Sequence, residues 1–351
     1  MKPQLTLAAA TLAALPALGH AESFTATVVA GHPPVFRWVQ MIDAAFVPAV
    51  EAALEGTEDT ISFTGLYGGA VAGVGEELEA VESGLAEIGV CQSLFDPSKL
   101  AEQNVTYYTP FVTSEPRLVS EVMDELHQND PRMLQAYEDN GVHYLGAPLA
   151  LDDYLLMTNF PVEFLADLEG HKIGAPGAAI NWLSGTGATG VAGNLTTYYN
   201  EIKAGVFDGV IVFGSAALPS KLHEVAPYIT QLGLGAQFAG GLCVNQAWWD
   251  GLTPNVQQAL ETGADAAQDW YLVSLEAAAE TAITTMEAEG ATVTQASDQL
   301  RQDWAAGMDN AAATWAADLD NQGRPGSEIL QAYMEAIRAA GAEPVRAWDQ
   351  E

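Results

Sequence analysis

The chain has 351 residues, 49% of them apolar, which is enough for about two domains with a hydrophobic core each. Asp and Glu outnumber Lys and Arg by 46 to 12, so the formal net charge is -34. So negative a surface repels nucleic acid phosphates and anionic lipid headgroups, and we exclude nucleic-acid binding and peripheral membrane binding as primary functions.

The first residues have the pattern of a secretory signal peptide. Lys2 precedes an apolar stretch at residues 5–18, and small residues stand at Gly19 and Ala21. We expect cleavage after Ala21, so that residues 1–21 are removed during export. No later apolar run is long enough to cross a bilayer, so we expect no stable membrane insertion.

The first part of the exported chain alternates strands and helices. Its apolar patterns predict a first lobe, and the elements are strands at residues 24–30, 61–63 and 86–90, and helices at residues 35–54 and 76–83. A glycine-rich loop is expected at residues 65–69. Such alternation predicts a largely parallel α/β sheet, whose ligands collect at the carboxyl ends of the strands.

A second α/β pattern begins near residue 150. It predicts strands at residues 154–158 and 172–175, and then a strand at residues 238–244 that returns to the first lobe. We therefore expect residues 22–150 plus 240–280 in lobe I and residues 151–239 plus 281–351 in lobe II.

A long helix is expected to brace the two lobes. Thr253 and Pro254 form a helix start, and the sequence then favours helix until Gly290, a length on the order of 50 Å. The last predicted helix covers residues 327–340, with apolar side chains at helical spacing that we interpret as packing.

The motifs that could carry catalysis or bind a cofactor are weak or missing. Residues 185–190 match GxGxxG, but a helical segment precedes them where a dinucleotide-binding fingerprint needs a strand. The six histidines have no zinc-ligand spacing, and no GxSxG or Walker A sequence occurs. We therefore expect no cofactor, no metal and no enzymatic activity.

The chain has two cysteines, Cys91 and Cys243, at a spacing that matches no redox or metal motif. Each lies in a short apolar run of predicted strand, which is typical of a small buried thiol. In an oxidising compartment the two could also pair.

An exported, two-lobed α/β chain without a catalytic constellation has the features of a solute-binding protein, in which a cleft between lobes closes on a ligand by hinge motion. The more specific signals lie in residues 67–89, 165–173, 199–209 and 244–252. Through these stretches the sequence resembles the periplasmic solute-binding subunits of TRAP (tripartite ATP-independent periplasmic) transporters, the DctP-like family.

This resemblance implies a fold of two α/β lobes joined by crossing strands and a long helix. It also implies a monomer in the periplasm that captures a small organic solute and delivers it to the small and large membrane subunits of the transporter. Two alternatives stay open: a binding protein that feeds a membrane sensor, and a secreted hydrolase or lyase, for which we find no base and nucleophile.

The sequence departs from the family pattern at the expected ligand anchor. Most members have an arginine after the Lys-Ile pair, which clamps a ligand carboxylate, and this chain has Gly174 there. A second family arginine is missing near Leu155. A buried carboxylate would then lack compensation, so we expect a cationic or neutral polar ligand in place of a typical dicarboxylate. A carboxylate held by a different anchor is the alternative.

The candidate ligand contacts combine aromatic and polar side chains near predicted strand ends. Asp153 is the proposed anchor for a cation, and the aromatic residues could supply cation–π contacts or only pack in the core. The full set is His32, Tyr67, Gln92, Phe95, Asp153, Tyr154, Asn181, Trp182 and Phe213.

Overall fold

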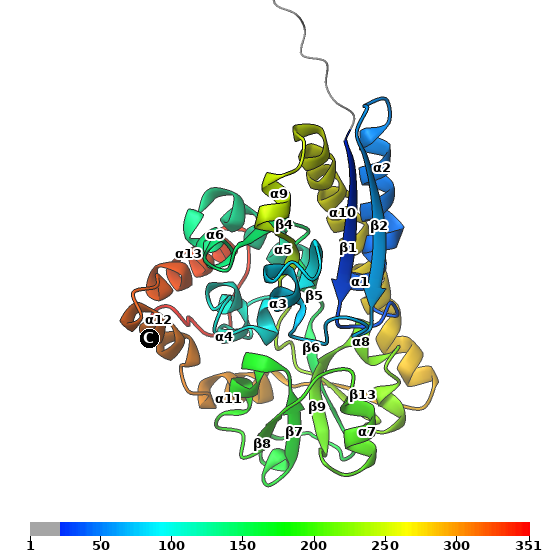
Figure 1. Ribbon diagram of the computed structural model, residues 1–351. Helices are drawn as coiled ribbons and strands as arrows, with labels where there is room; N and C mark the ends of the chain where they lie inside the picture. The colour runs from blue at the N-terminus through cyan, green and yellow to red at the C-terminus, as the bar shows by residue number, and fades with distance from the viewer. Residues whose placement is uncertain (1–21) are drawn as a thin grey trace, which may run out of the picture.

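The computed structural model describes residues 22–351 and has two α/β lobes, one above the other in Figure 1. The predicted signal peptide lies outside the described residues. Each lobe is built on one large β-sheet, and a small two-stranded sheet is formed by the segments that connect the lobes. Among the described residues, no helix has the length and apolar character that crossing a bilayer requires.

The first sheet has the strand order β2-β1-β3-β12-β4. Strands β1, β2 and β3 are parallel, whereas β12 is antiparallel to both of its neighbours. β1 is partly exposed at its start and buried over its last residues, because its carboxyl end enters the core between the lobes. The strands are β1 (Ser23–Ala30), β2 (Thr60–Tyr67), β3 (Ile88–Cys91), β4 (Val142–Gly146) and β12 (Gly241–Asn245).

The second sheet has the strand order β13-β10-β6-β9-β7-β8. Every residue of β6 and β9 is buried, as expected for strands covered on both faces. β6 is antiparallel to both of its neighbours, as β12 is in the first sheet. The prediction of parallel pairing is therefore wrong for these two strands, and each of them comes directly after the chain crosses from one lobe to the other. The strands are β6 (Tyr154–Thr158), β7 (Lys172–Ala175), β8 (Thr189–Ala192), β9 (Gly209–Phe213), β10 (Tyr228–Gln231) and β13 (Thr292–Gln295).

Three segments connect the lobes. The chain passes from β4 to β6 through β5 (Ala150–Leu151) and returns from β10 to β12 through β11 (Gln237–Phe238), and β5 and β11 pair antiparallel. The third is the long helix α10 (Pro254–Ala288), which packs on α1, α2 and β4 of the first lobe and on α8 and β13 of the second. The predicted long helix is confirmed, and the side chain of Thr253 caps its start.

The other helices surround the two sheets, and α12 and α13 lie farther out, stacked on α4 and α5 (Figure 1). The predicted helix at residues 35–54 is confirmed as α1 and α2, which are joined by the π-helical turn Ile42–Phe46. The α-helices besides α10 are α1 (Arg37–Met41), α2 (Val47–Leu54), α3 (Glu77–Glu82), α4 (Val105–Tyr108), α5 (Pro116–Asn129), α6 (Pro131–Asp139), α7 (Tyr198–Lys203), α8 (Gly214–Ala217), α9 (Gln246–Asp250), α11 (Asp298–Gly307), α12 (Ala311–Asn321) and α13 (Gly326–Ala339).

Two predicted strands have different bounds in the structure. The strand expected at residues 61–63 extends to Tyr67, because all eight residues of β2 pair with β1, and the loop therefore opens at Gly68. The strand expected at residues 238–244 is interrupted between β11 and β12. Gly240 has φ 129° there, and a Cβ at this position would lie 2.0 Å from the carbonyl oxygen of Cys91, so only glycine fits the turn.

The two cysteines form a disulfide bond, the alternative that the sequence left open beside two buried thiols. Cys91 on β3 and Cys243 on β12 are completely buried in neighbouring antiparallel strands, with their Cα atoms 5.9 Å apart. This separation is suited to a disulfide. The pairing depends on β12 returning from the second lobe to lie beside β3.

The C-terminal segment makes contacts with both lobes. We expected residues 281–351 in lobe II, and β13 does belong to the second sheet. However, α12 packs on α4, and α13 packs on α4 and α5, which are elements of the range assigned to lobe I. The C-terminal helices therefore cover the side of the first lobe (Figure 1).

Candidate functional site

A cavity lies between the two lobes, at the carboxyl ends of strands from both sheets. The space in it that a water-sized molecule can occupy is about 20 Å³, so the lobes leave little free room between them. His32 follows β1, Gln92 follows β3, Pro176 follows β7 and Phe213 ends β9. This is where open α/β sheets bind their ligands. The lining residues are His32, Trp38, Gln92, Leu94, Phe95, Leu151, Tyr154, Pro176, Leu195, Tyr198, Ile211, Val212 and Phe213.

Aromatic rings form much of the wall and bring the two lobes into contact. The ring centroids of Trp38 in the first lobe and Phe213 in the second lie 6.0 Å apart. Tyr154 packs on Phe213 at 5.0 Å, and Phe36 stacks on Trp38 at 4.6 Å. The ring of His32 meets Trp38 edge-on at 5.4 Å. The site is therefore closed on two sides by aromatic surfaces from different lobes.

His32 is held in one orientation by Gln92. Its Nδ1 lies 2.8 Å from Oε1 of Gln92, and the residue is only 2% exposed. Burial lowers the pKa of His32 to about 4, since desolvation disfavours the charged imidazolium form. The imidazole is therefore neutral at neutral pH.

Three lining side chains have a buried polar atom without a hydrogen-bond partner among the described residues. These atoms are Nε2 of His32, Nε1 of Trp38 and the hydroxyl of Tyr198. The hydroxyl of Tyr154, in contrast, is satisfied by the hydroxyl of Tyr107 at 2.9 Å. Buried polar atoms are normally paired, so three such atoms around one cavity indicate a place for a polar ligand.

No charged side chain is present among the described residues that line the cavity. Gly174, at the position of the family arginine, is buried in β7, and a Cβ there would lie 3.0 Å from both Phe207 and Val210. These two side chains occupy the space into which a larger residue would extend. The cavity can therefore provide hydrogen bonds and apolar contact, but no direct ion pair.

The structure brings together five of the nine predicted ligand contacts: His32, Gln92, Phe95, Tyr154 and Phe213. The predicted residues that it places outside the lining are Tyr67, Asp153, Asn181 and Trp182.

Each of the four residues outside the lining has another environment. Tyr67 donates its hydroxyl to Asp43 at 2.9 Å. Asp153, the expected anchor, accepts the Gly235 amide at 2.8 Å and lines a separate cavity beside α10. Asn181 lines a surface hollow near α12.

Trp182 is completely buried and donates its indole N–H to the carbonyl oxygen of Tyr107 at 2.7 Å. Its ring is stacked on that of Tyr107, at a centroid distance of 5.8 Å. Trp182 is therefore part of the packing behind the cavity wall, the alternative that we kept open for every aromatic candidate.

The sequence interpretation missed two polar contributors to the cavity, Trp38 and Tyr198. Trp38 lies in the first turn of the helix that follows β1, so its position after a predicted strand was a usable signal. Tyr198 begins α7, and no local pattern distinguishes it from Tyr199, whose hydroxyl bonds to Glu224 on the surface at 2.9 Å.

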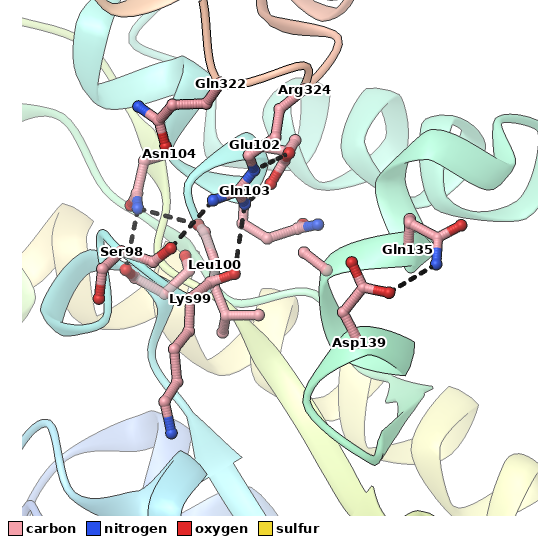
Figure 2. A network of polar contacts seen from close by, with 12 residues as sticks. Ser98, Lys99, Leu100, Glu102, Gln103, Asn104, Gln135, Asp139, Gln322 and Arg324 are labelled. Atoms are coloured by element: carbon pink, nitrogen blue, oxygen red, sulfur yellow. Dashed lines mark hydrogen bonds and ion pairs between the residues drawn. The ribbon is translucent and has the colours of Figure 1, made fainter. Parts of the chain in front are cut away.

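A second polar cluster lies away from the cavity, where the C-terminal helices meet the first lobe (Figure 2). Arg324 donates to the buried carboxylate of Glu102 and to the carbonyl oxygen of Ser98 at 2.9 Å. Asn104 donates to the carbonyl oxygen of Leu100 at 3.1 Å. Because Arg324 belongs to the C-terminal segment and pairs with Glu102 and Ser98 of the first lobe, we interpret the cluster as the attachment of that segment.

The family comparison matches residues 49–318 to DctP, described as "Bacterial extracellular solute-binding protein, family 7". No curated protein matches the chain.

Several solved structures have the same fold. A marine metagenome TRAP solute-binding protein specific for pyroglutamate gives a TM-score of 0.78 at 18% identity, covering 90% of this chain and 99% of that one. DctP7 of Bordetella pertussis, a solute receptor that binds pyroglutamic acid, gives a TM-score of 0.75 at 18% identity, covering 88% of this chain and 99% of that one. A TRAP periplasmic protein of Sulfitobacter sp. NAS-14.1 with bound β-D-galacturonate gives the same values. The expected two-lobed solute-binding fold is confirmed.

Proposed function

Since the chain belongs to bacterial extracellular solute-binding protein family 7, the DctP family, we propose that it captures a small organic solute in the cavity between its lobes. It then delivers the solute to the small and large membrane subunits of a TRAP transporter. The observation that carries this proposal is the cavity itself, with strand ends from both sheets and three unpaired buried polar atoms in its wall.

The hinge needed for capture has a candidate in the connections between the lobes. The β5–β11 pair and α10 are the segments shared by both lobes, while Trp38 and Phe213 meet across the cavity. Opening would separate these rings and expose the lining, and closing on a ligand would bury it. The protein acts in the periplasm after removal of residues 1–21.

The ligand is a polar molecule without a negative charge. The similar structures bind pyroglutamate and galacturonate, which are carboxylates, but the lining of this cavity contains neither arginine nor lysine. A carboxylate buried there would lose its hydration without gaining an ion pair. Because Asp153 lies outside the lining, a neutral ligand is favoured over a cation. A carboxylate with another anchor is the second candidate, and the known ligands of the similar structures are its support.

A thermal-shift screen tests capture of a solute. The protein is produced with its leader, purified from the periplasm, and heated with neutral polar solutes, amines, and mono- and dicarboxylates. A ligand at about a thousand times its Kd stabilises the folded state by about 4 kcal/mol, so the melting temperature rises by several degrees. We expect this for a neutral solute.

Two phenylalanine variants show whether the solute binds in the cavity. Phe95 lines the cavity, whereas Phe164 is 67% exposed elsewhere in the second lobe. Phe95→Ala should weaken binding by about tenfold and reduce the temperature rise by about a third, and Phe164→Ala should leave it unchanged. Equal rises in both variants would contradict binding in this cavity, and a rise with carboxylates alone would contradict a neutral ligand.

A further inference from the structure

The hydrogen-bonding groups in the cavity wall have defined donor and acceptor roles. Oε1 of Gln92 can only accept, so Nδ1 of His32 carries the proton and donates to it. With the ring neutral, Nε2 of His32 is left with a lone pair and acts as an acceptor. Nε1 of Trp38 is an N–H group and can only donate, while the hydroxyl of Tyr198 can do either.

These three atoms are buried and have no hydrogen-bond partner among the described residues. Each has given up its hydrogen bonds to water, and a ligand can replace those bonds. His32 and Trp38 are each 2% exposed and Tyr198 is 1% exposed. The rings of His32 and Trp38 are perpendicular at a centroid distance of 5.4 Å, and both residues line the same cavity.

We propose, on the basis of the proposed function, that the ligand presents a neutral amide group, as in a carboxamide or a lactam. Its N–H donates to Nε2 of His32, and its carbonyl oxygen accepts from Nε1 of Trp38 and from the hydroxyl of Tyr198. The apolar remainder of the ligand packs on the surface formed by Tyr154 and Phe213, two rings of the second lobe in contact at a centroid distance of 5.0 Å.

Other ligand classes fit this arrangement less well. A carboxylate has no hydrogen to donate, so it would face the lone pair of His32 in a buried site. An ammonium group has no acceptor for Trp38. A polyol could satisfy the three atoms, but its other hydroxyls would lie against aliphatic side chains, among them Leu94, Leu195 and Ile211, without partners.

Matched pairs of an amide and its acid test the proposal by calorimetric titration at neutral pH. The probes are nicotinamide with nicotinate, and benzamide with benzoate. We expect the amide of at least one pair to bind at least tenfold more tightly than its acid. N,N-Dimethylation of the amide, which removes both N–H groups that can reach His32, should abolish that preference.

Conservative variants show whether the named atoms hold the amide. Trp38→Phe and Tyr198→Phe each remove one polar atom and keep an aromatic ring, so each should weaken amide binding by about 3- to 10-fold. Tyr199→Phe is the matched control, because Tyr199 is the next residue of α7 and its hydroxyl bonds to Glu224 on the surface at 2.9 Å. It should change the affinity by less than about twofold.

The failures of the two proposals are distinguishable. If acids bind and their amides do not, or if Trp38→Phe and Tyr198→Phe bind the amide as tightly as the wild type, the amide assignment is overturned and capture in the cavity stands. If Phe95→Ala and Phe164→Ala respond equally to every probe that binds, the cavity is not the binding site and the proposed function fails as well.

Discussion

Asp152 is a buried carboxyl group at the start of β6, where the chain enters the second sheet. It is 5% exposed and accepts hydrogen bonds from the amide and hydroxyl of Ser215 at the start of α8. Burial nevertheless raises the pKa of Asp152 to about 6, because desolvation of the carboxylate outweighs these bonds. The folded protein therefore holds this proton more tightly than the unfolded chain.

Asp152→Asn should change how stability depends on pH. Between about pH 4 and pH 6 the unfolded Asp152 loses its proton while the folded one keeps it, so the wild type loses stability as the pH rises. The uncharged carboxamide of the variant does not titrate and has no such effect. The free energy of unfolding of the wild type should fall relative to the variant by at most about 3 kcal/mol over this range. Denaturant unfolding at several pH values measures the difference.

Asp167 provides a control with the opposite sign. It is an exposed carboxylate that accepts the amides of Glu163 and Phe164, which lower its pKa. Its contribution is present above the unfolded pKa and is lost as the pH falls through the folded one, so Asp167→Asn should lower stability above about pH 4, and its difference from the wild type should shrink below that pH. If the wild type and Asp152→Asn have parallel stability profiles from pH 4 to pH 6, the burial argument for Asp152 is wrong.

Individual contacts could be predicted where a side chain follows a strand. His32, Gln92 and Phe213 come at the ends of strands, and the general rule for α/β sheets places them at the site. Asp153 also stands beside a strand, but at its entrance, and its carboxylate bonds to Gly235 instead of facing the cavity. Tyr198 could not be found, because its position depends on how α7 packs against the second sheet.

The disulfide between β3 and β12 is an element-scale feature that the sequence interpretation left undecided. Cys91 and Cys243 are 152 residues apart in the chain, and the intervening residues include most of the second lobe. Closing so long a loop restricts the unfolded chain considerably. The bond therefore fixes the segment that returns from the second lobe to the strand that leads to Gln92.

Replacement of both cysteines by serine should lower the free energy of unfolding by about 2 to 4 kcal/mol. Guanidinium unfolding of the double variant and the wild type under non-reducing conditions measures this loss. Thiol titration of the unfolded wild type without reductant is the accompanying control, and it should find no free thiol. Two free thiols, or a variant as stable as the wild type, would contradict the stabilising disulfide.

Elements with strong local signals were predicted closely. β6 and β7 have the expected bounds, and α10 begins at Pro254 as its capping residues indicated. β2 is longer than predicted because pairing with β1 extends it through a glycine. The antiparallel direction of β6 and β12 could not be derived, since it depends on the course of the connections between lobes.

At the scale of the whole molecule, the two lobes share a small set of connections and a strongly negative surface. The net charge is -34, and only some of the acidic side chains form ion pairs, such as Glu276 with Arg117 and Asp349 with Arg338. The cavity differs from this surface, because its lining is aromatic, aliphatic and neutral polar. The two-lobed fold and solute capture could be predicted from the family resemblance. The lining residues could not, because they are brought together only where the two lobes meet.

A crystal structure of the complex with the tightest-binding solute from the screen tests the central claim most directly. We predict one solute between the lobes, in contact with Trp38 from the first lobe and with Tyr154 and Phe213 from the second. A solute bound instead beside Asp153 and α10, or in the hollow near Glu102 and Arg324, with the aromatic cavity unchanged, would contradict this account of the function.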